Sequence, residues 1–333
     1  MILAGDIGGT NTRLAVFGVA GNRLKLVTEQ RFPSREHKTL DQIVSTFMST
    51  YQPAIKQACF GVAGPVKDGR CVATNLPWFV DAHDLAGILG LETVYLINDL
   101  EANAYGAAVL EPSDLLTLNE GETGSKGNAA IIAAGTGLGE AGYYWDGYQH
   151  YPFACEGGHT DFGPRNELEI ELLRFLLVRF EHVSYERVLS GPGLLNIYEF
   201  LRHTGHGEEP DWLADEMRQQ DPSAVISKAA LDERSELCKR ALDLFVSLYG
   251  AEAGNLALKT MALGGLFVGG GIAPKIIAKL TDGTFMRAFT DKGRMRTYLE
   301  AIPVRVILND KTALLGAAYF VRIQNTDKPF SLP

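Results

Sequence analysis

The sequence predicts an α/β protein with two domains. Its 333 residues are more than one compact hydrophobic core usually holds. Short apolar runs typical of buried strands alternate with longer segments of helical spacing. A Gly/Thr-rich turn near the N-terminus has a counterpart in the middle of the chain, so each expected half contains one such turn.

The first part of the chain is expected to form one small α/β domain. Strands are expected at residues 2–4, 13–17, 24–31, 58–62 and 94–97, and helices at 40–51, 85–89 and 100–110. The helix over 40–51 is the clearest, because Leu40, Ile43, Val44 and Phe47 fall on one face. This domain is expected to contain residues 1–110 and the C-terminal residues 312–333.

Residues 111–311 are expected to form the larger α/β domain. Its first segment, Glu111–Asn128, is polar and Gly-rich, so we interpret it as a crossing between the domains. Strands are expected at 129–134, 266–268 and 304–308, and helices at 168–180 and 237–258. A final helix over 312–323 returns the chain to the small domain.

The composition excludes several classes of protein. Hydrophobic residues make up 46% and charged residues 21% of the chain, which argues against disorder. The net charge is −9 with no basic stripe, so we expect no nucleic-acid partner. The four cysteines form no Cys-x-x-Cys pair, which is typical of reduced thiols in a cytoplasmic protein. No signal peptide and no apolar run of about 18 residues is present, so we expect no membrane association.

The segment Asp6–Arg13 has the composition of an anion-binding turn. Gly8 and Gly9 allow successive backbone N–H groups to face an anion, and Thr10 adds a hydroxyl donor. Asp6 cannot bind phosphate directly, but its carboxylate can hold a water on Mg²⁺. A plain hairpin turn that needs glycine is the alternative, and the turn alone does not decide between the two.

A second turn, Gly135-Thr136-Gly137, has the same chemistry. Gly137, Gly139 and Gly142 also match the G-x-G-x-x-G spacing of dinucleotide-binding proteins. That motif opens a helix, whereas Ala141–Trp145 favours a strand. A nicotinamide-dependent sugar dehydrogenase therefore remains only as a rival hypothesis. The sequence has no Walker A pattern, which excludes a P-loop kinase.

Two more segments follow apolar strands. Gly269-Gly270-Gly271 allows a base and ribose to lie against the backbone, although a tight connection alone also explains it. Asn98 and Asp99 follow the expected strand 94–97, and ligands of α/β sheets bind beyond the carboxyl ends of strands. A carboxylate there can accept the proton of an attacking hydroxyl. The alternative for Asp99 is a helix N-cap, which Asp often provides.

The remaining polar candidates suit a polyhydroxylated ligand, because each sugar hydroxyl is both a donor and an acceptor. Glu156 and His159 lie in a Gly-rich segment, Glu186 precedes Ser190-Gly191-Pro192-Gly193, and Asn75 lies in a turn. The alternatives are a solvated helix face for Glu186, a structural histidine for His159 and a simple turn for Asn75.

The order of these segments resembles that of the actin/hexokinase/Hsp70 superfamily, and in detail that of the bacterial glucokinase family. The resemblance covers essentially the whole chain, and Glu186–Gly193 is its most specific part. It implies a two-domain actin-like ATPase (ribonuclease H-like) α/β fold with the active site in the interdomain cleft. It also implies ATP-dependent phosphorylation of D-glucose at the 6-hydroxyl, Mg²⁺ bound with the ATP, and a homodimer.

The resemblance further implies a role for each candidate residue. Asp99 would be the general base, and Asp6 would contact Mg²⁺ through water. The residues implied in sugar binding are Asn75, Asn98, Asp99, Glu156, His159 and Glu186. The residues implied in nucleotide binding are Gly5, Asp6, Ile7, Gly8, Gly9, Thr10, Asn11, Gly135, Thr136, Gly137, Gly269, Gly270 and Gly271.

One departure from a neighbouring family concerns zinc. Sugar kinases of the ROK type have a Cys-rich zinc motif after the Glu-x-x-His position, whereas this chain has only Cys155 nearby. We therefore expect no structural zinc. A kinase for another hexose on the same fold remains an alternative to a glucose kinase.

Overall fold

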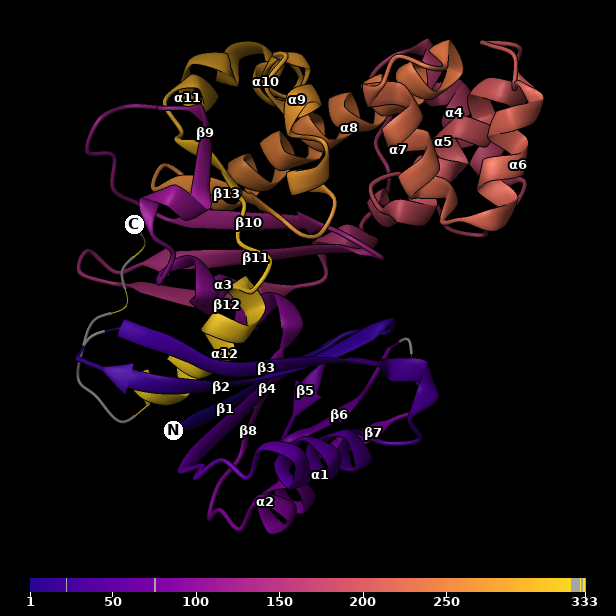
Figure 1. Cartoon of the computed structure of the whole chain (residues 1–333). Coiled ribbons are helices and arrows are strands. Elements are labelled where there is room, and N and C mark those ends of the chain that lie inside the picture. Colours follow the sequence, from indigo (N-terminus) through magenta and orange to yellow (C-terminus); the bar gives the residue numbers. More distant parts are fainter. Residues whose placement is uncertain (22, 75, 325–329, 331, 333) are drawn as a thin grey trace. The chain divides into compact units, whose positions relative to one another are not determined.

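The structure is a computed structural model that describes residues 1–21, 23–74, 76–324, 330 and 332 (Figure 1). Contacts group the chain into two compact units. Unit 1 contains Met1–Asp114, Tyr143–Ala154 and Asn309–Pro333, and unit 2 contains Leu115–Gly142 and Cys155–Leu308. The segment Tyr143–Ala154 thus joins unit 1, whereas the sequence analysis expected it in the larger domain. The domain boundaries expected from the sequence stay a prediction.

Unit 1 is built on a five-stranded sheet with the order β3-β2-β1-β4-β8. The strands are β1 (Ile2–Ile7), β2 (Asn11–Ala20), β3 (Arg23–Pro33), β4 (Gln57–Val62) and β8 (Tyr95–Asn98). β1 pairs with β2 in antiparallel and with β4 in parallel orientation, and β4 pairs with β8 in parallel orientation. A small second sheet contains β5 (Val66–Lys67), β6 (Arg70–Val72) and β7 (Phe79–Asp81).

Helices cover both faces of this sheet (Figure 1). They are α1 (Leu40–Tyr51), α2 (Ala82–Leu89), α3 (Asp99–Ala107) and α12 (Thr312–Ile323), with short 3₁₀ turns at Ser34–Glu36 and Pro112–Asp114. One face packs on α1 and α2, where Phe47 is fully buried and contributes about 2–3 kcal/mol. The other face packs on α3 and α12 through Leu314 and Ala102. The predicted bounds of α1 and α12 are confirmed.

The second large sheet has the order β12-β11-β10-β13-β14-β9. Most of it belongs to unit 2, whereas the end of β11 and most of β12 lie in the segment Tyr143–Ala154 of unit 1. The strands of this sheet are β9 (Leu115–Asn119), β10 (Ala129–Ala134), β11 (Leu138–Trp145), β12 (His150–Cys155), β13 (Gly265–Gly269) and β14 (Val304–Ile307). β10, β13 and β14 run parallel, and β9 pairs with β14 in antiparallel orientation. Without β9, the strands follow one another in the same spatial order as in the sheet of unit 1. The similarity between the two Gly/Thr turns therefore reflects a repeated sheet.

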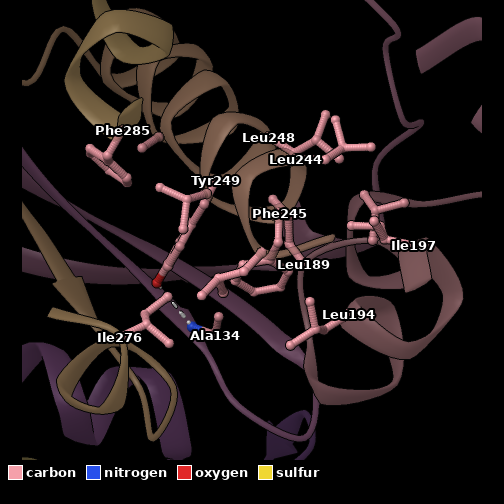
Figure 2. Close-up of a cluster of buried hydrophobic side chains, with 14 of the residues drawn as sticks. Ala134, Leu189, Leu194, Ile197, Leu244, Phe245, Leu248, Tyr249, Ile276 and Phe285 are labelled. Atoms are coloured by element: carbon pink, nitrogen blue, oxygen red, sulfur yellow. Dashed lines mark hydrogen bonds between the residues drawn. The ribbon is translucent and has the colours of Figure 1, made fainter. Parts of the chain in front are cut away.

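The helices of unit 2 surround one hydrophobic core. They are α4 (Glu167–Leu177), α5 (Gly191–His203), α6 (Asp211–Gln219), α7 (Pro222–Leu231), α8 (Glu236–Thr260), α9 (Ile277–Leu280), α10 (Thr284–Thr290) and α11 (Arg296–Glu300), with 3₁₀ turns at Gly157–His159, Tyr185–Arg187, Ala273–Lys275 and Gly293–Met295. The 25-residue α8 is the main buried helix, and Phe245 and Tyr249 on it are fully buried (Figure 2). Across the described residues, no helix is both long and apolar enough to cross a membrane.

The segment Glu111–Asn128, interpreted as a crossing between the domains, contains a strand that was not predicted. Leu115–Asn119 forms the edge strand β9, which pairs with Val304–Ile307. The side chain of Asn119 also donates hydrogen bonds to the carbonyls of Glu300 and Ile302. The strand depends on a partner almost 190 residues away in the sequence, and local composition does not contain that information.

Candidate functional site

Three segments of unit 1 meet at one edge of the sheet. Ile7 of β1 is paired with Val62 of β4, and Val62 is paired with Asn98 of β8. Because these strands are parallel, their carboxyl ends lie side by side. The register therefore places the Gly8–Thr10 turn next to the turn that follows Val62, and that turn next to Asn98 and Asp99.

Asn98 organises the start of α3. Its side-chain oxygen accepts hydrogen bonds from the N–H groups of Leu100 and Glu101 at 2.8 and 3.3 Å, and its amide nitrogen donates to the Gly64 carbonyl at 3.1 Å. Asn98 is thus the N-cap, and Asp99 is the first residue of the helix. The alternative interpretation of Asp99 as the cap residue is therefore wrong, although Asp99 Oδ1 accepts a bond from Leu100 N–H at 3.0 Å.

Internal hydrogen bonds shape the first Gly/Thr turn. The Gly8 N–H donates to the Asn11 carbonyl at 3.0 Å. Ser34 holds the turn from outside, because its hydroxyl donates to the Gly8 carbonyl at 2.7 Å and its N–H donates to the Thr10 carbonyl at 3.0 Å. Nothing in the local sequence around Ser34 indicated this role.

Asp6 lies just before this turn, and its side chain is half-buried. Burial raises the pKa of Asp6 to about 6, and the nearby Arg13 lowers it in part. Arg13 Nη1 also contacts Asp310 Oδ2 at 3.0 Å and the Asp310 carbonyl at 2.8 Å. Burial disfavours the charged form of Asp6, and a bound cation nearby would stabilise that form. Asp6 is therefore suited to a position close to a cation.

In unit 2, the two Gly-rich turns lie next to each other. β10 and β13 are adjacent and parallel, with Ala133 paired with Gly269, so Gly135–Gly137 and Gly270–Gly271 leave the sheet at the same edge. Gly270 has a φ of +84°, and a Cβ on it would lie 2.2 Å from the Ala134 carbonyl oxygen. Only glycine fits this close approach.

Tyr249 of α8 reaches the strand ends that lead into these turns, and Figure 2 shows its hydroxyl hydrogen-bonded to the Ala134 N–H. Its hydroxyl accepts a hydrogen bond from the Ala134 N–H at 3.2 Å. The same hydroxyl lies within donating distance of the Ile132 and Gly269 carbonyls, at 3.3 and 3.2 Å. Tyr249 therefore joins β10 to β13 just before both turns. Tyr249 was not predicted as a site residue, because a tyrosine in an apolar helix is typical of the hydrophobic core.

Glu186 contacts the Gly135–Gly137 turn. Its Oε2 atom accepts a hydrogen bond from the Leu138 N–H at 3.1 Å, and it occupies the space beside Gly137, where a Cβ would lie 2.4 Å away. The Gly191 N–H donates to the Gly135 carbonyl at 2.8 Å. Because of these contacts, Glu186 is not simply part of a solvated helix face.

Glu156 directly precedes the 3₁₀ turn at Gly157–His159, and His159 is the last residue of that turn. His159 Nε2 and Glu156 Oε2 lie 3.9 Å apart, and their side chains are 56% and 70% exposed. The turn packs directly on β11, since a Cβ on Gly158 would lie 2.1 Å from the Leu138 carbonyl oxygen. The first residues of β11 thus bring together the Gly135–Gly137 turn, Glu186 and the turn that bears His159.

The candidate residues are divided between the units. Asp6, the Gly8–Thr10 turn, Asn98 and Asp99 belong to unit 1, whereas Glu156, His159, Glu186 and both other Gly-rich turns belong to unit 2. Asn75 lies outside the described residues.

The cysteines and acidic side chains bear on the metal expectation. All four cysteines are unpaired thiols, and only Cys155 is exposed. In the part of the chain that the structure describes, no group of three His, Cys, Asp or Glu side chains could hold a metal ion. The expected absence of zinc stays a prediction.

A family model described as Glucokinase matches residues 3–324 of this chain. A glucokinase of Nostoc punctiforme is 42% identical over 96% of this chain and 98% of its own length. The crystal structure of a glucokinase from an Antarctic psychrotroph is 33% identical and has a TM-score of 0.80, with 97% of this chain and 98% of that chain covered.

More distant structures share the fold. A glucokinase of Balamuthia mandrillaris in complex with glucose is 22% identical, with a TM-score of 0.80 over 96% of this chain and 93% of that chain. A ROK family glucokinase of Streptomyces griseus in complex with glucose and AMPPNP is 21% identical, with a TM-score of 0.66 over 97% and 99%.

The fold is therefore the two-domain α/β fold of actin-like kinases, and the protein is a sugar kinase, a phosphotransferase with an alcohol group as acceptor. More specifically, the chain belongs to the glucokinase family.

Proposed function

We propose that this protein transfers the γ-phosphate of ATP to the 6-hydroxyl of D-glucose. Membership of the glucokinase family supports the activity. The observation in this chain that carries the mechanism is the sheet register of unit 1, in which Ile7, Val62 and Asn98 form one row. That row puts a carboxylate, Asp99, at the same sheet edge as a phosphate-binding turn.

Asp99 is the general base in this mechanism. It accepts the proton of the sugar 6-hydroxyl as that oxygen bonds to phosphorus. Asn98 orients Asp99, because its side-chain oxygen caps α3 and holds the first helical turn in place. One N–H of the Asn98 amide is used by the Gly64 carbonyl, and we assign the second to a sugar hydroxyl.

Both Gly/Thr turns bind the phosphate chain. In each turn the first N–H is used internally, by the Asn11 carbonyl in one and by the Gly137 carbonyl in the other. We therefore assign the following N–H groups, those of Gly9 and Thr10 and those of Thr136 and Gly137, to phosphate oxygens. Gly269–Gly271 borders the adenosine.

Mg²⁺ fits the residues present. Asp6 provides a half-buried carboxyl whose pKa is raised, and a hard cation held mainly by phosphates and water needs few protein ligands. When bound, Mg²⁺ would neutralise charge on the phosphates, and Asp6 would hold one of its waters.

Glu156, His159 and Glu186 bind the sugar hydroxyls. Glu156 and His159 are exposed side chains close enough to act together, and Glu186 is oriented by the Leu138 N–H. Because the base belongs to unit 1 and these three residues to unit 2, the mechanism requires both units to form one site. This requirement, the expected homodimer and the cytoplasmic location stay predictions.

The rival dehydrogenase hypothesis loses its main support. Gly137, Gly139 and Gly142 lead into and lie within the strand β11, whereas a dinucleotide fingerprint opens a helix. A kinase for another hexose remains the second candidate, because carboxylates and an imidazole bind hydroxyls of many sugars.

Release of ADP tests the proposal. The purified protein is assayed with MgATP and, separately, with glucose, mannose, fructose and N-acetylglucosamine. We expect the highest kcat/KM with glucose and a product that carries phosphate on the 6-hydroxyl. ADP release that does not depend on any of these sugars, or that favours another hexose, would contradict the proposal.

A further inference from the structure

Glu140 is a buried carboxyl for which the mechanism above has no use. It lies on β11, two residues after Leu138, and it is 1% exposed. Its Oε1 atom has no hydrogen-bond partner among the described residues. Burying such an oxygen without a partner is costly, so its presence requires a reason.

The other carboxyl oxygen of Glu140 supports the turn at Gly157–His159. A Cβ on Gly157 would lie 1.8 Å from Glu140 Oε2 and 3.2 Å from Glu140 Cβ. The Gly157 backbone therefore rests directly on the carboxyl. Together with the contact between Gly158 and the Leu138 carbonyl, this packing sets the position of a turn whose neighbours, Glu156 and His159, are the proposed sugar ligands.

The surroundings of Glu140 favour its uncharged form. Burial, and then the nearby Glu252, raise the pKa of Glu140 to about 8, while Lys259 lowers it in part. Glu252 is itself fully buried, and it holds Lys259 at 3.4 Å and the Asn255 amide at 2.7 Å. The lysine charge is thus shared with a second carboxyl.

Two further titratable groups near Glu140 are a thiol and a hydroxyl, and neither of them supplies a positive charge. Burial raises the pKa of the Cys155 thiol at the end of β12, and burial also raises the pKa of the Tyr249 hydroxyl on α8. The side chains of Glu156 and His159 on the turn are mostly exposed to solvent. Among the described residues, Lys259 is the cation that lowers the pKa of Glu140.

We propose that Glu140 is a positioning residue for the sugar: its protonated carboxyl supports the Gly157–His159 turn, and loss of that proton weakens glucose binding. The physical reason is hydration. Water greatly stabilises a carboxylate whose oxygen has no hydrogen-bond partner. The Gly157 backbone lies directly on this carboxylate, so hydration of the carboxylate displaces the turn. Movement of this turn displaces Glu156 and His159. The inference rests on the proposed function, because it assigns these two residues to glucose.

Replacement of Glu140 by glutamine tests the inference, because Glu140→Gln keeps the shape and cannot ionise. KM for glucose and kcat are measured at saturating ATP for both proteins across the pH range. In the unsubstituted protein we expect KM for glucose to rise about tenfold between about pH 7 and about pH 9, since one proton is lost near pH 8. In Glu140→Gln the rise should be less than about twofold, with the same kcat profile in both proteins.

Glu171→Gln is the matched control. Glu171 is an exposed residue of α4 in the same unit, so this variant should follow the unsubstituted protein. An equal rise of KM in the unsubstituted protein and in Glu140→Gln would overturn the inference. Absence of glucose-dependent ADP release from the unsubstituted protein would instead overturn the proposed function.

A double-mutant cycle checks the contact itself. Gly157→Ala places a methyl group where Glu140 Oε2 lies, so KM for glucose should rise. Glu140→Ala removes the carboxyl, and in that background the effect of Gly157→Ala should be at least about fivefold smaller. Independent effects of the two substitutions would contradict the contact.

The pH dependence of stability provides a readout that does not need activity. The pKa of Glu140 is raised from 4.5 to about 8, so the folded protein holds a proton that the unfolded chain loses. The free energy of unfolding should therefore fall as the pH rises through this window and lose that dependence in Glu140→Gln. Equal slopes in the two proteins would show that Glu140 is already ionised and would overturn the inference.

Discussion

Unit 1 and unit 2 share a strand order, and strand register positions Gly-rich turns in both, but the candidate residues of unit 2 also depend on close glycine contacts. In unit 1, the pairing of Ile7, Val62 and Asn98 aligns the ends of three parallel strands. In unit 2, backbone at Gly157, Gly158 and Gly270 packs on neighbouring atoms with no room for a side chain.

Strand register and close glycine contacts should tolerate substitutions differently. Sheet register is maintained by many backbone hydrogen bonds, so a single side-chain change at the end of a strand alters chemistry without moving the site. A glycine contact is abolished by one methyl group, so substitutions there alter position and stability. The two units should therefore respond differently to small changes.

Asp99→Asn in unit 1 should have the largest effect. It keeps the shape and removes the base, so kcat should fall by about 10²- to 10⁴-fold, equivalent to about 3–5 kcal/mol. KM for glucose should stay within about threefold, because the register still positions the residue. Steady-state kinetics with Glu101→Gln as the control checks this, since residue 101 points to a different side of α3. Near-normal turnover of Asp99→Asn would remove Asp99 from the mechanism.

Gly270→Ala in unit 2 should have the next largest effect, on stability. A φ of +84° and the 2.2 Å approach to the Ala134 carbonyl should together lower the free energy of unfolding by about 2 kcal/mol or more. Gly271→Ala, in the same turn but with no atom within 4 Å of its Cβ, should cost less than about 0.5 kcal/mol. Urea unfolding of both variants measures the difference. Equal costs would show that the close approach does not determine the turn.

Tyr249→Phe should have the smallest effect. It removes the hydroxyl that accepts from the Ala134 N–H, which leaves a buried donor without a partner and costs about 1–2 kcal/mol. KM for ATP should rise modestly, because both nucleotide turns start at this link. Tyr144→Phe, at a site that is 56% exposed, is the control in thermal unfolding. The same melting temperature for both variants would contradict the role of Tyr249.

Much of the fold could be predicted from local patterns. The helix over Leu40–Tyr51 begins after Thr39, whose hydroxyl accepts a bond from the Gln42 N–H, and its apolar residues share one face. The helix over Thr312–Ile323 and the strand over Ala129–Ala134 were predicted with the bounds that the structure has. β9 was missed, because Leu115–Asn119 becomes a strand only by pairing with Val304–Ile307.

For the candidate site, the sequence indicated the motifs but not the residues that hold those motifs in place. The Gly-rich turns, Asn98-Asp99 and Glu186 were recognisable, since their chemistry and spacing are local features. Three supporting residues were not recognisable, because each contacts backbone that is distant in the sequence. Ser34 contacts Gly8, Glu140 contacts Gly157, and Tyr249 contacts Ala134 and Gly269.

By itself, the sequence determined that this protein is an α/β sugar kinase candidate with two Gly/Thr turns and a carboxylate after a strand. Those features depend on residue type and spacing, which folding does not change. Only the tertiary structure decided that Asn98 rather than Asp99 caps α3, that Glu186 contacts the second turn, and that a buried Glu140 lies under Gly157. Such contacts depend on strand register and on the close approach of distant backbone segments, and no local pattern encodes either of them.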